Sequence, residues 1–286
     1  MVDASNRDDE KTRPPKGSSL EDPLAIKLLS YIKPVMPCNI GRIHGIGRRG
    51  SQQDSLGVSD IDDIEAVKKK GVLTIVADGM GGLSDGDLVS STVVVTMLEA
   101  FDHMASVEYP ASSLLEMVCK ANEKVNMIIG NERIGKCGST VVATIIQNKK
   151  LSYISIGDSR IYLYRKEKIY RLNKEHNYGT QLDDKVLRGE ISADEALTAP
   201  HRNALTSFIG MGSLEYVDQN ETPIELETYD RILLMSDGVY GTVDDSVLTN
   251  ILKLSFKESL IRLNDEIIHK NKEKQDNYTC IMLEIK

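Results

Sequence analysis

The stretch VLTIVADGMGG, residues 72–82, decides how this chain folds and where its chemistry lies. The continuous apolar run from Leu73 to Ala77 is typical of a strand that is buried on both faces. The run ends at Asp78, and a glycine-rich turn and then a helical pattern with one apolar stripe follow it. The stretch therefore predicts a buried strand that carries a carboxylate on a rigid mount.

Three further aspartates stand beside predicted strands. They are Asp158 after LSYISIG, Asp237 after RILLMS and Asp276 before YTCIMLEI. Acids at neighbouring strand ends can converge on one point, and packed carboxylates repel one another unless cations lie between them. Ligand sets made only of oxygen suit hard ions such as Mg²⁺ or Mn²⁺. The sequence therefore predicts an enzyme with a carboxylate centre for two metal ions.

Each of these motifs also has a simpler explanation. Asp-Gly is common in turns, so Asp237-Gly238 alone would be structural, and Asp158 could pair with Arg160. Glycines between a strand and a helix can also cradle a dinucleotide, but the G-x-G-x-x-G spacing is absent and Asp78 would repel phosphate. The repetition favours metal binding, and Gly79 lets its own carbonyl approach a cation.

A short cationic segment, RRGSQQD at residues 48–54, precedes these strands. A guanidinium binds phosphate through two parallel hydrogen bonds, so Arg49 is a candidate phosphate ligand, whereas Arg48 is expected to be a surface arginine. Asp54 is expected to hold a metal-bound water rather than the metal itself. The five histidines show neither HxxxH nor HxH spacing, so none is assigned to a metal.

Composition limits the kinds of partner. The chain has 286 residues, 41% hydrophobic, and a net charge of −8, which argues against nucleic acid or an anionic membrane as a general partner. The four cysteines form no CxxC pair, and Cys119 and Cys280 are expected to be small buried hydrophobes. The polar N-terminus has no apolar signal-peptide core. We expect a soluble cytoplasmic monomer.

The order of predicted elements indicates an α+β fold. Residues 1–36 are expected to form a flexible tail and a short docking segment, and residues 37–286 one catalytic domain. Short connections at residues 148–150 and 166–167 predict hairpins, and helices come in two groups, each adjacent to a run of strands. These features predict a four-layer α-β-β-α sandwich, with two antiparallel sheets face to face and the strand ends at Asp78 and Asp237 facing one another.

One segment interrupts the run of strands. Residues 177–200 carry two short helical patterns, and Ser192 with Glu195 forms a capping box at the second of them. We expect a mobile insert over the candidate site.

The order of these elements resembles the metal-dependent protein phosphatases of type 2C in their bacterial form. The matching elements are Arg49…Asp54, Asp78–Gly82, Gly138-Ser139-Thr140, Gly157–Tyr162, Arg202-Asn203-Ala204-Leu205-Thr206, Ser236–Gly238 and Asp276-Asn277. They occur in the family's order and extend over nearly the whole chain apart from the tail. The resemblance implies a β-sandwich flanked by helices that hydrolyses phosphoserine and phosphothreonine in proteins, the substrates of a serine/threonine kinase.

The resemblance also implies a role for each site residue. Asp78 would bridge two Mn²⁺ or Mg²⁺ ions, the carbonyl of Gly79 would bind one of them, and Asp237 with Asp276 would bind the other. Asp158, with Asp237, would hold a third ion. Arg49 would bind the substrate phosphate, and the insert at residues 177–200 would be the family's flap. Asn277 belongs to the last element and is a secondary candidate.

Two positions depart from the family pattern. Gln53 stands where the family usually has glutamate, which removes a charge and lowers the expected metal affinity. Met80 stands where some members have a histidine that acts as a general acid, so the leaving oxygen must take its proton from another group. Gln53 leaves one alternative, a catalytically weak or inactive relative that binds phosphoproteins as a scaffold. The retained acids and Arg49 favour the enzyme.

Overall fold

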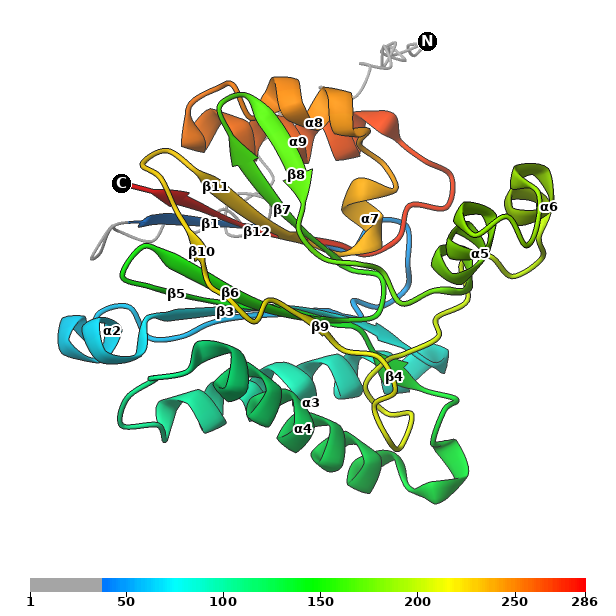
Figure 1. Ribbon diagram of the computed structural model, residues 1–286, viewed down its shortest axis with the longest axis horizontal. Coiled ribbons are helices and arrows are strands. Elements are labelled where there is room, and N and C mark those ends of the chain that lie inside the picture. Colours follow the sequence, from blue (N-terminus) through cyan, green and yellow to red (C-terminus); the bar gives the residue numbers. More distant parts are fainter. Residues whose placement is uncertain (1–37) are drawn as a thin grey trace, which may run out of the picture.

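Two antiparallel β-sheets lie face to face between layers of helices in the computed structural model, which describes residues 38–286 (Figure 1). The first sheet orders its strands β1 (Cys38–Gly45), β12 (Tyr278–Ile285), β11 (Arg231–Met235), β7 (Arg160–Arg165) and β8 (Lys168–Arg171). The second orders β10 (Ile224–Glu225), β6 (Lys150–Ile156), β5 (Val141–Gln147), β3 (Val72–Met80) and β2 (Asp54–Val58), with β4 (Gly138–Ser139) paired to β3 and β9 (Asp218–Gln219) to β6.

Helices cover the outer face of each sheet. The helices within residues 38–286 are α2 (Ile64–Lys70), α3 (Gly82–Asp102), α4 (Pro110–Ile129), the 3₁₀ turn η1 (Asn131–Arg133), α5 (Tyr178–Leu187), α6 (Ala193–Thr198), α7 (Asp237–Tyr240), α8 (Asp245–Ile251) and α9 (Phe256–Lys270). Figure 1 shows α3 and α4 under the second sheet, and α8 and α9 over the first. The predicted α-β-β-α sandwich is confirmed.

Strand β3 is buried on both faces, as its apolar run predicts. Leu73 and Ile75 pack in the layer between the second sheet and helices α3 and α4. Val72 and Val76 point the other way, into the layer between the two sheets. Because side chains alternate along a strand, one continuous apolar segment serves both hydrophobic layers and fixes the register of β3.

Two tight hairpins make the sheets antiparallel. The β5–β6 turn has positive φ at both central residues, 53° at Asn148 and 57° at Lys149. The β7–β8 turn does the same at Lys166 and Glu167, with φ of 50° and 61°. Such turns match the twist of the strands that they join. Both predicted hairpins are confirmed.

The strand that contains Asp78 is longer than its apolar run indicates. We predicted that the strand ends before Asp78, but β3 continues to Met80. Asp54 on β2 pairs with Asp78, and Gly79 pairs with Ser139 on β4. Ladder pairing on both sides therefore keeps the backbone extended through the glycine, and Asp78 gains the rigidity of the sheet itself.

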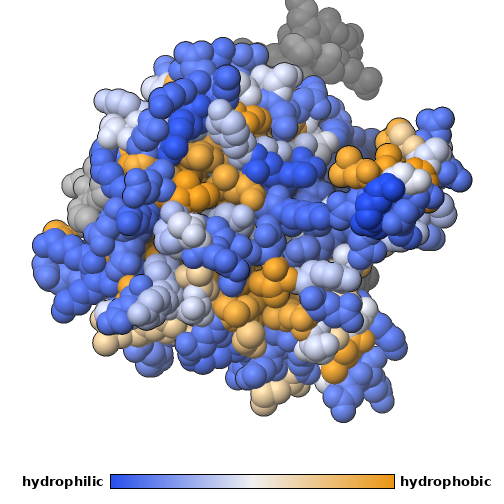
Figure 2. All heavy atoms as spheres, in the orientation of Figure 1, coloured by the Kyte–Doolittle hydropathy of each residue, from blue (hydrophilic) through white to orange (hydrophobic). Residues whose placement is uncertain are grey.

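The segment 177–200 forms α5 and α6, which project from one end of the sandwich (Figure 1). The Ser192–Glu195 capping box is present, as predicted. Figure 2 shows hydrophobic side chains on this projecting arm, and Leu187 and Leu197 are 85% and 68% exposed.

Two other expectations can be compared with the fold. The predicted tail and docking segment, residues 1–36, lie outside the described residues. Cys119 is exposed on α4, so its expected burial is wrong, whereas Cys280 is buried on β12 as predicted. The helical pattern places Cys119 beside the apolar stripe rather than in it. None of the helices between residues 38 and 286 has the length and apolar character to cross a membrane.

Candidate metal centre

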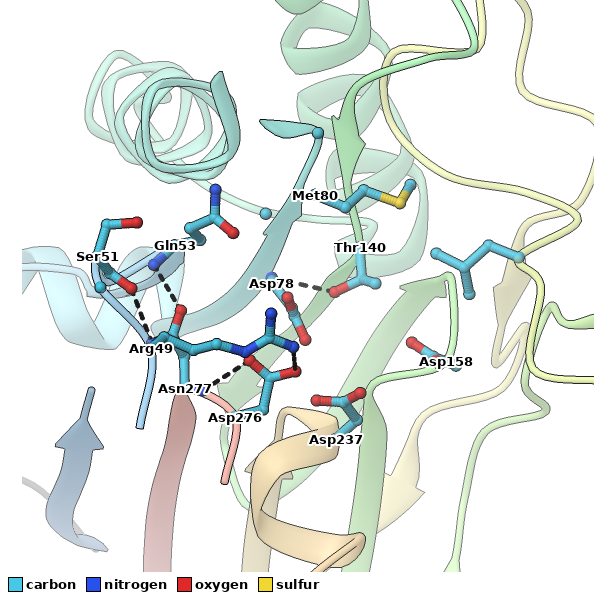
Figure 3. A pocket seen from close by; sticks show the side chains of 14 residues that line it. Arg49, Ser51, Gln53, Asp78, Met80, Thr140, Asp158, Asp237, Asp276 and Asn277 are labelled. Atoms are coloured by element: carbon cyan, nitrogen blue, oxygen red, sulfur yellow. Dashed lines mark hydrogen bonds and ion pairs between the residues drawn. The ribbon is translucent and has the colours of Figure 1, made fainter. Parts of the chain in front are cut away.

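The four predicted aspartates line one cavity of about 510 Å³ at the end of the sandwich. Asp78 comes from β3 in one sheet, and Asp237 begins α7 directly after β11 in the other. Asp158 lies in the connection from β6 to β7, and Asp276 precedes β12. Figure 3 shows Asp78, Asp158 and Asp237 around a shared space, with Arg49 paired to Asp276 at its side. The expected convergence of strand ends from both sheets is confirmed.

Thr140 fixes Asp78 from the neighbouring chain segment. Its backbone N–H donates to the carbonyl of Asp78 at 2.8 Å, and its Oγ1 accepts from the Asp78 N–H at 3.1 Å. The same hydroxyl contacts Ser159 Oγ at 2.8 Å, next to Asp158. One threonine thus ties together the segments that carry two of the acids.

The glycine after each of two aspartates is required by close packing. A Cβ added to Gly79 would lie 2.0 Å from the carbonyl oxygen of Gly86 at the start of α3. A Cβ added to Gly238 would lie 1.9 Å from the carbonyl oxygen of Asn277. Backbone occupies both spaces, so no side chain fits there. The Asp-Gly pairs therefore let α3 and the Asp276–Asn277 segment approach the aspartates.

Arg49 lines the cavity on the side where Asp276 lies. Its Nη2 contacts Asp276 Oδ2 at 2.5 Å, and its side chain is 57% exposed. This contact raises the pKa of the guanidinium further, first through the hydrogen bond and then through charge attraction. An exposed, permanently charged guanidinium at the cavity mouth can bind an anion that enters from solvent.

Asn277 and Gln53 hold the loop that carries Arg49. The Asn277 amide donates to the carbonyls of Ile46 and Ser51 at 2.9 and 3.0 Å, and its Oδ1 accepts from the Gln53 N–H at 2.8 Å. The carbonyl of Gln53 in turn accepts from the Gly79 N–H at 3.0 Å. Both residues line the cavity, and these contacts give Asn277 a loop-holding role.

Asp54 lies apart from the residues that line the cavity. It is 4% exposed, and its Oδ2 accepts from Ser236 Oγ and Thr279 Oγ1, both at 2.7 Å. Its backbone pairs with Asp78. Asp54 is therefore a buried carboxylate held by two hydroxyls directly beside the strand that carries Asp78.

Burial and mutual repulsion perturb the acids strongly. Desolvation, followed by the charge of Asp54, raises the pKa of Asp78 well above its ordinary value. Desolvation and Asp237 raise the pKa of Asp158 to about 7. Desolvation is also the main reason that the pKa of Asp54 rises to about 6 and that of Asp237 rises. Such clusters of shifted acids mark functional sites, and a cation between them would remove the repulsion.

The residues fit a hard cation by their chemistry. Asp237 Oδ1 is buried with no hydrogen-bond partner in the part of the chain that the structure describes, which is costly for a carboxylate oxygen. The four aspartates and the Gly79 carbonyl offer only oxygen donors, which Mn²⁺ and Mg²⁺ prefer. Within residues 38–286 no three His, Cys, Asp or Glu side chains are already gathered in ligand geometry. The fit therefore rests on the donor set, the repulsion and the orphaned oxygen.

Sequence reasoning missed several side chains that build this centre. Tyr240 donates its hydroxyl to the carbonyl of Asp158 at 3.0 Å, and no sequence signal marks it. Ser236 and Thr279 both donate hydrogen bonds to Asp54. Each lies beside a predicted metal-binding aspartate, and the sequence pattern marks only that aspartate. Thr140 was visible as part of the Gly138-Ser139-Thr140 element, but its contacts to Asp78 were not.

Known proteins share both this sequence pattern and this fold. The family model for protein phosphatase 2C matches residues 49–275. A serine/threonine phosphatase of Listeria innocua is 30% identical over 223 residues, which cover 76% of this chain and 86% of the relative. A serine/threonine phosphatase structure from S. agalactiae superposes with a TM-score of 0.74 at 21% identity, over 87% of this chain and all of that one. The catalytic domain of the phosphatase PstP, solved with two manganese ions, superposes with a TM-score of 0.67 at 23% identity, over 87% of this chain and 98% of that one. The chain therefore belongs to the protein phosphatase 2C family.

Proposed function

We propose that this chain hydrolyses phosphoserine and phosphothreonine in proteins at the four-aspartate cavity, with two Mn²⁺ or Mg²⁺ ions. One observation carries the proposal: acids from both sheets line one cavity with an exposed arginine at its mouth. The family consists of metal-dependent phosphatases, which agrees with this arrangement. Nothing in the fold favours the scaffold alternative, because every acid that the resemblance requires lies at the cavity or directly beneath it.

The proposed ligands are the groups that surround the cavity. Asp78 would bridge the two ions, the Gly79 carbonyl would complete one site, and Asp237 with Asp276 the other. Asp158 and Asp237 would hold a third ion. When bound, such ions supply a water of lowered pKa and offset the charge of the phosphoryl oxygens. The donor set and the orphaned oxygen of Asp237 support these assignments.

The remaining chemistry belongs to the protein's own side chains. Asp54 keeps Oδ1 for a further partner because both hydroxyls reach Oδ2, so it can orient the attacking water by accepting a hydrogen bond. Met80 lines the cavity and has no proton to give, so the leaving oxygen takes its proton from another group. The protein supplies mainly positioning and charge, as phosphoryl transfer requires.

Arg49 is the proposed phosphate ligand, and its neighbour provides a matched control. We expect Arg49→Ala to lower kcat/KM for a phosphothreonine peptide by about 100-fold, the usual value of a lost charge-assisted bidentate contact. Arg48 instead bonds Asn271 on the surface, so Arg48→Ala should leave kcat/KM unchanged. Steady-state kinetics at saturating Mn²⁺ would check both variants. An equal loss in the two would show a general charge effect rather than phosphate binding.

The α5–α6 insert is proposed as a flap that contacts the protein substrate near the cavity. Its exposed Leu187 and Leu197 offer apolar contact area, and Leu205, just after the insert, lines the cavity itself. The chain's net charge of −8 supports phosphoproteins rather than nucleic acid or an anionic membrane as partners. We further propose a monomer that acts in the cytoplasm, where kinase substrates occur.

The decisive test is metal-dependent turnover. We expect hydrolysis of para-nitrophenyl phosphate and of a phosphothreonine peptide with Mn²⁺, and no hydrolysis of either after addition of a chelator. Absence of turnover at every Mn²⁺ concentration, from a sample shown to be folded by circular dichroism, would instead support the phosphoprotein-binding scaffold.

A further inference from the structure

A chain of hydrogen bonds leads from Asp54 away from the cavity to a histidine on another strand. Thr279 Oγ1 on β12 donates to Asp54 Oδ2 at 2.7 Å, and His44 Nδ1 on β1 lies 2.9 Å from the same Oγ1. His44 and Thr279 are direct partners in the β1–β12 ladder. The assigned chemistry of the site makes no use of His44.

Proton accounting decides the direction of these bonds. Asp54 holds two hydroxyls on one oxygen, and an ionised carboxylate only accepts, so both hydroxyls must donate to it. Each hydroxyl has a single proton and must therefore accept from its other neighbour. Ser236 Oγ accepts from the backbone N–H of Thr279 at 2.9 Å. Among residues 38–286, His44 Nδ1 is the group that Thr279 Oγ1 meets in the corresponding position, so that nitrogen must carry the proton.

We propose that His44 is a positioning residue of the phosphatase reaction, whose Nδ1–H fixes the Thr279 hydroxyl so that its proton points at Asp54. The inference rests on the proposed role of Asp54 in orienting the attacking water. With the ring proton on Nε2 instead, the Thr279 hydroxyl could rotate and donate to Nδ1, and without the ring the hydroxyl would lose the partner that fixes its rotation. Asp54 then loses one of the two bonds that hold its carboxylate plane.

The hydrogen-bonded groups around Asp54 are buried, so water cannot readily take the place of a missing partner. Thr279 and Ser236 are fully buried and Asp54 is 4% exposed, so solvent has little access to replace the histidine. Desolvation lowers the pKa of His44 and so keeps its ring neutral, with one N–H to place. A neutral ring with its proton on Nδ1 leaves Nε2 as an acceptor. The hydrogen bond to Thr279 therefore selects one tautomer, which can be observed directly.

The first experiment reads that tautomer on the full chain by ¹⁵N NMR of the histidine rings at about pH 8, where Asp54 is ionised and the His44 ring is neutral. We expect the His44 signal, identified by its loss in His44→Leu, to show a protonated Nδ1 and an unprotonated Nε2. The opposite tautomer would overturn the proposal. This readout needs neither metal nor activity, so it remains decisive if the chain fails to hydrolyse para-nitrophenyl phosphate, a failure that would count against the proposed function alone.

The second experiment tests whether His44 acts through Thr279. With Mn²⁺ and para-nitrophenyl phosphate, His44→Leu should lower kcat about tenfold with KM unchanged, as outer residues of such sites typically do. Thr279→Val should lose at least as much, and Thr279→Ser should retain most of the activity because it keeps the hydroxyl. The double variant His44→Leu/Thr279→Val should be no worse than Thr279→Val. Additive losses, or full activity in His44→Leu, would contradict the proposal.

A matched control comes from the far end of the same ladder. Asn39 on β1 donates to Glu284 on β12 at 3.0 Å, and the two residues are also direct ladder partners. Asn39→Leu removes a cross-strand bond between the same two strands without touching the Asp54 network, so kcat should stay at the parent value. If His44→Leu is unfolded by circular dichroism, the His44 ring signal is assigned instead by through-bond correlation to its own backbone, and the tautomer together with the Thr279 variants still decides.

Discussion

Replacement of Asp78 by asparagine is expected to abolish turnover and, in the absence of metal, to raise the melting temperature of the protein. The two effects have one cause. Asp78 is surrounded by Asp54, Asp237 and Asp158, and desolvation with their charges raises its pKa well above the ordinary value. Without cations, the Asp78 carboxylate thus destabilises the folded protein. With cations, the same carboxylate is required for turnover. Stability and catalysis should therefore move in opposite directions, as is common at active sites.

Both expected changes, in turnover and in melting temperature, are large enough to measure. Turnover of para-nitrophenyl phosphate with Mn²⁺ should fall by at least about 1000-fold, because a ligand shared by two ions is lost. The melting temperature in chelator should rise by about 2 °C or more, because a buried like charge is removed. The amide has the same shape, so the contacts of the Asp78 backbone with Thr140 remain.

The exposed Asp62 offers a control for both readouts. Asp62→Asn makes the same chemical change outside the cavity and should alter neither turnover nor the melting temperature. Retained activity in Asp78→Asn at low Mn²⁺ would overturn the assignment of Asp78 as a metal ligand. A lower melting temperature in chelator would show that the asparagine disturbs packing, and the repulsion argument would then fail.

The strands and acids of this fold were predictable because each signal is local. The apolar run before Asp78 predicts a doubly buried strand, and its alternating side chains enter both hydrophobic layers. Asp-Gly after two such runs marked the acids, and the packing at Gly79 and Gly238 explains why that dipeptide is required. Short polar turns fixed the antiparallel pairing. These inferences needed only neighbouring residues.

The support around Asp54 was not predictable for the opposite reason. His44, Thr279 and Asp54 meet only because β1 pairs with β12 in one register and β2 lies across the sandwich. More than 200 residues separate Thr279 from either of the other two. No periodic pattern in the sequence predicts this contact, since each of the three residues is an ordinary polar residue on its own strand. The register of β1 against β12 is set by the tertiary fold. Residues such as His44, which act on the site through another side chain, depend on that register.

The second large effect concerns the metal-free protein, whose stability should fall as pH rises from 5 to 8. The pKa of Asp54 is about 6 and that of Asp158 about 7 in the folded chain, against an ordinary value of 3.8. A group with a raised folded-state pKa contributes its full stability below the unfolded value and loses it as pH rises through the folded value. The loss should thus begin near pH 4 and level off above about pH 7, so the fall measured between pH 5 and 8 should lie mainly below pH 7.

Calorimetry in chelator should show the melting temperature falling by on the order of 5–10 °C over this range. Mn²⁺ should restore most of it, and its stabilising shift should be larger at pH 8 than at pH 5, because protons and cations compete for the same oxygens. Asp158→Asn removes one titrating acid and should flatten the pH dependence in chelator. A constant or rising melting temperature from pH 5 to 8, or an equal Mn²⁺ shift at both ends, would mean that the acids are not electrostatically strained. In that case the cavity would not depend on cations for its stability, and the argument from repulsion to metal binding would lose its physical basis.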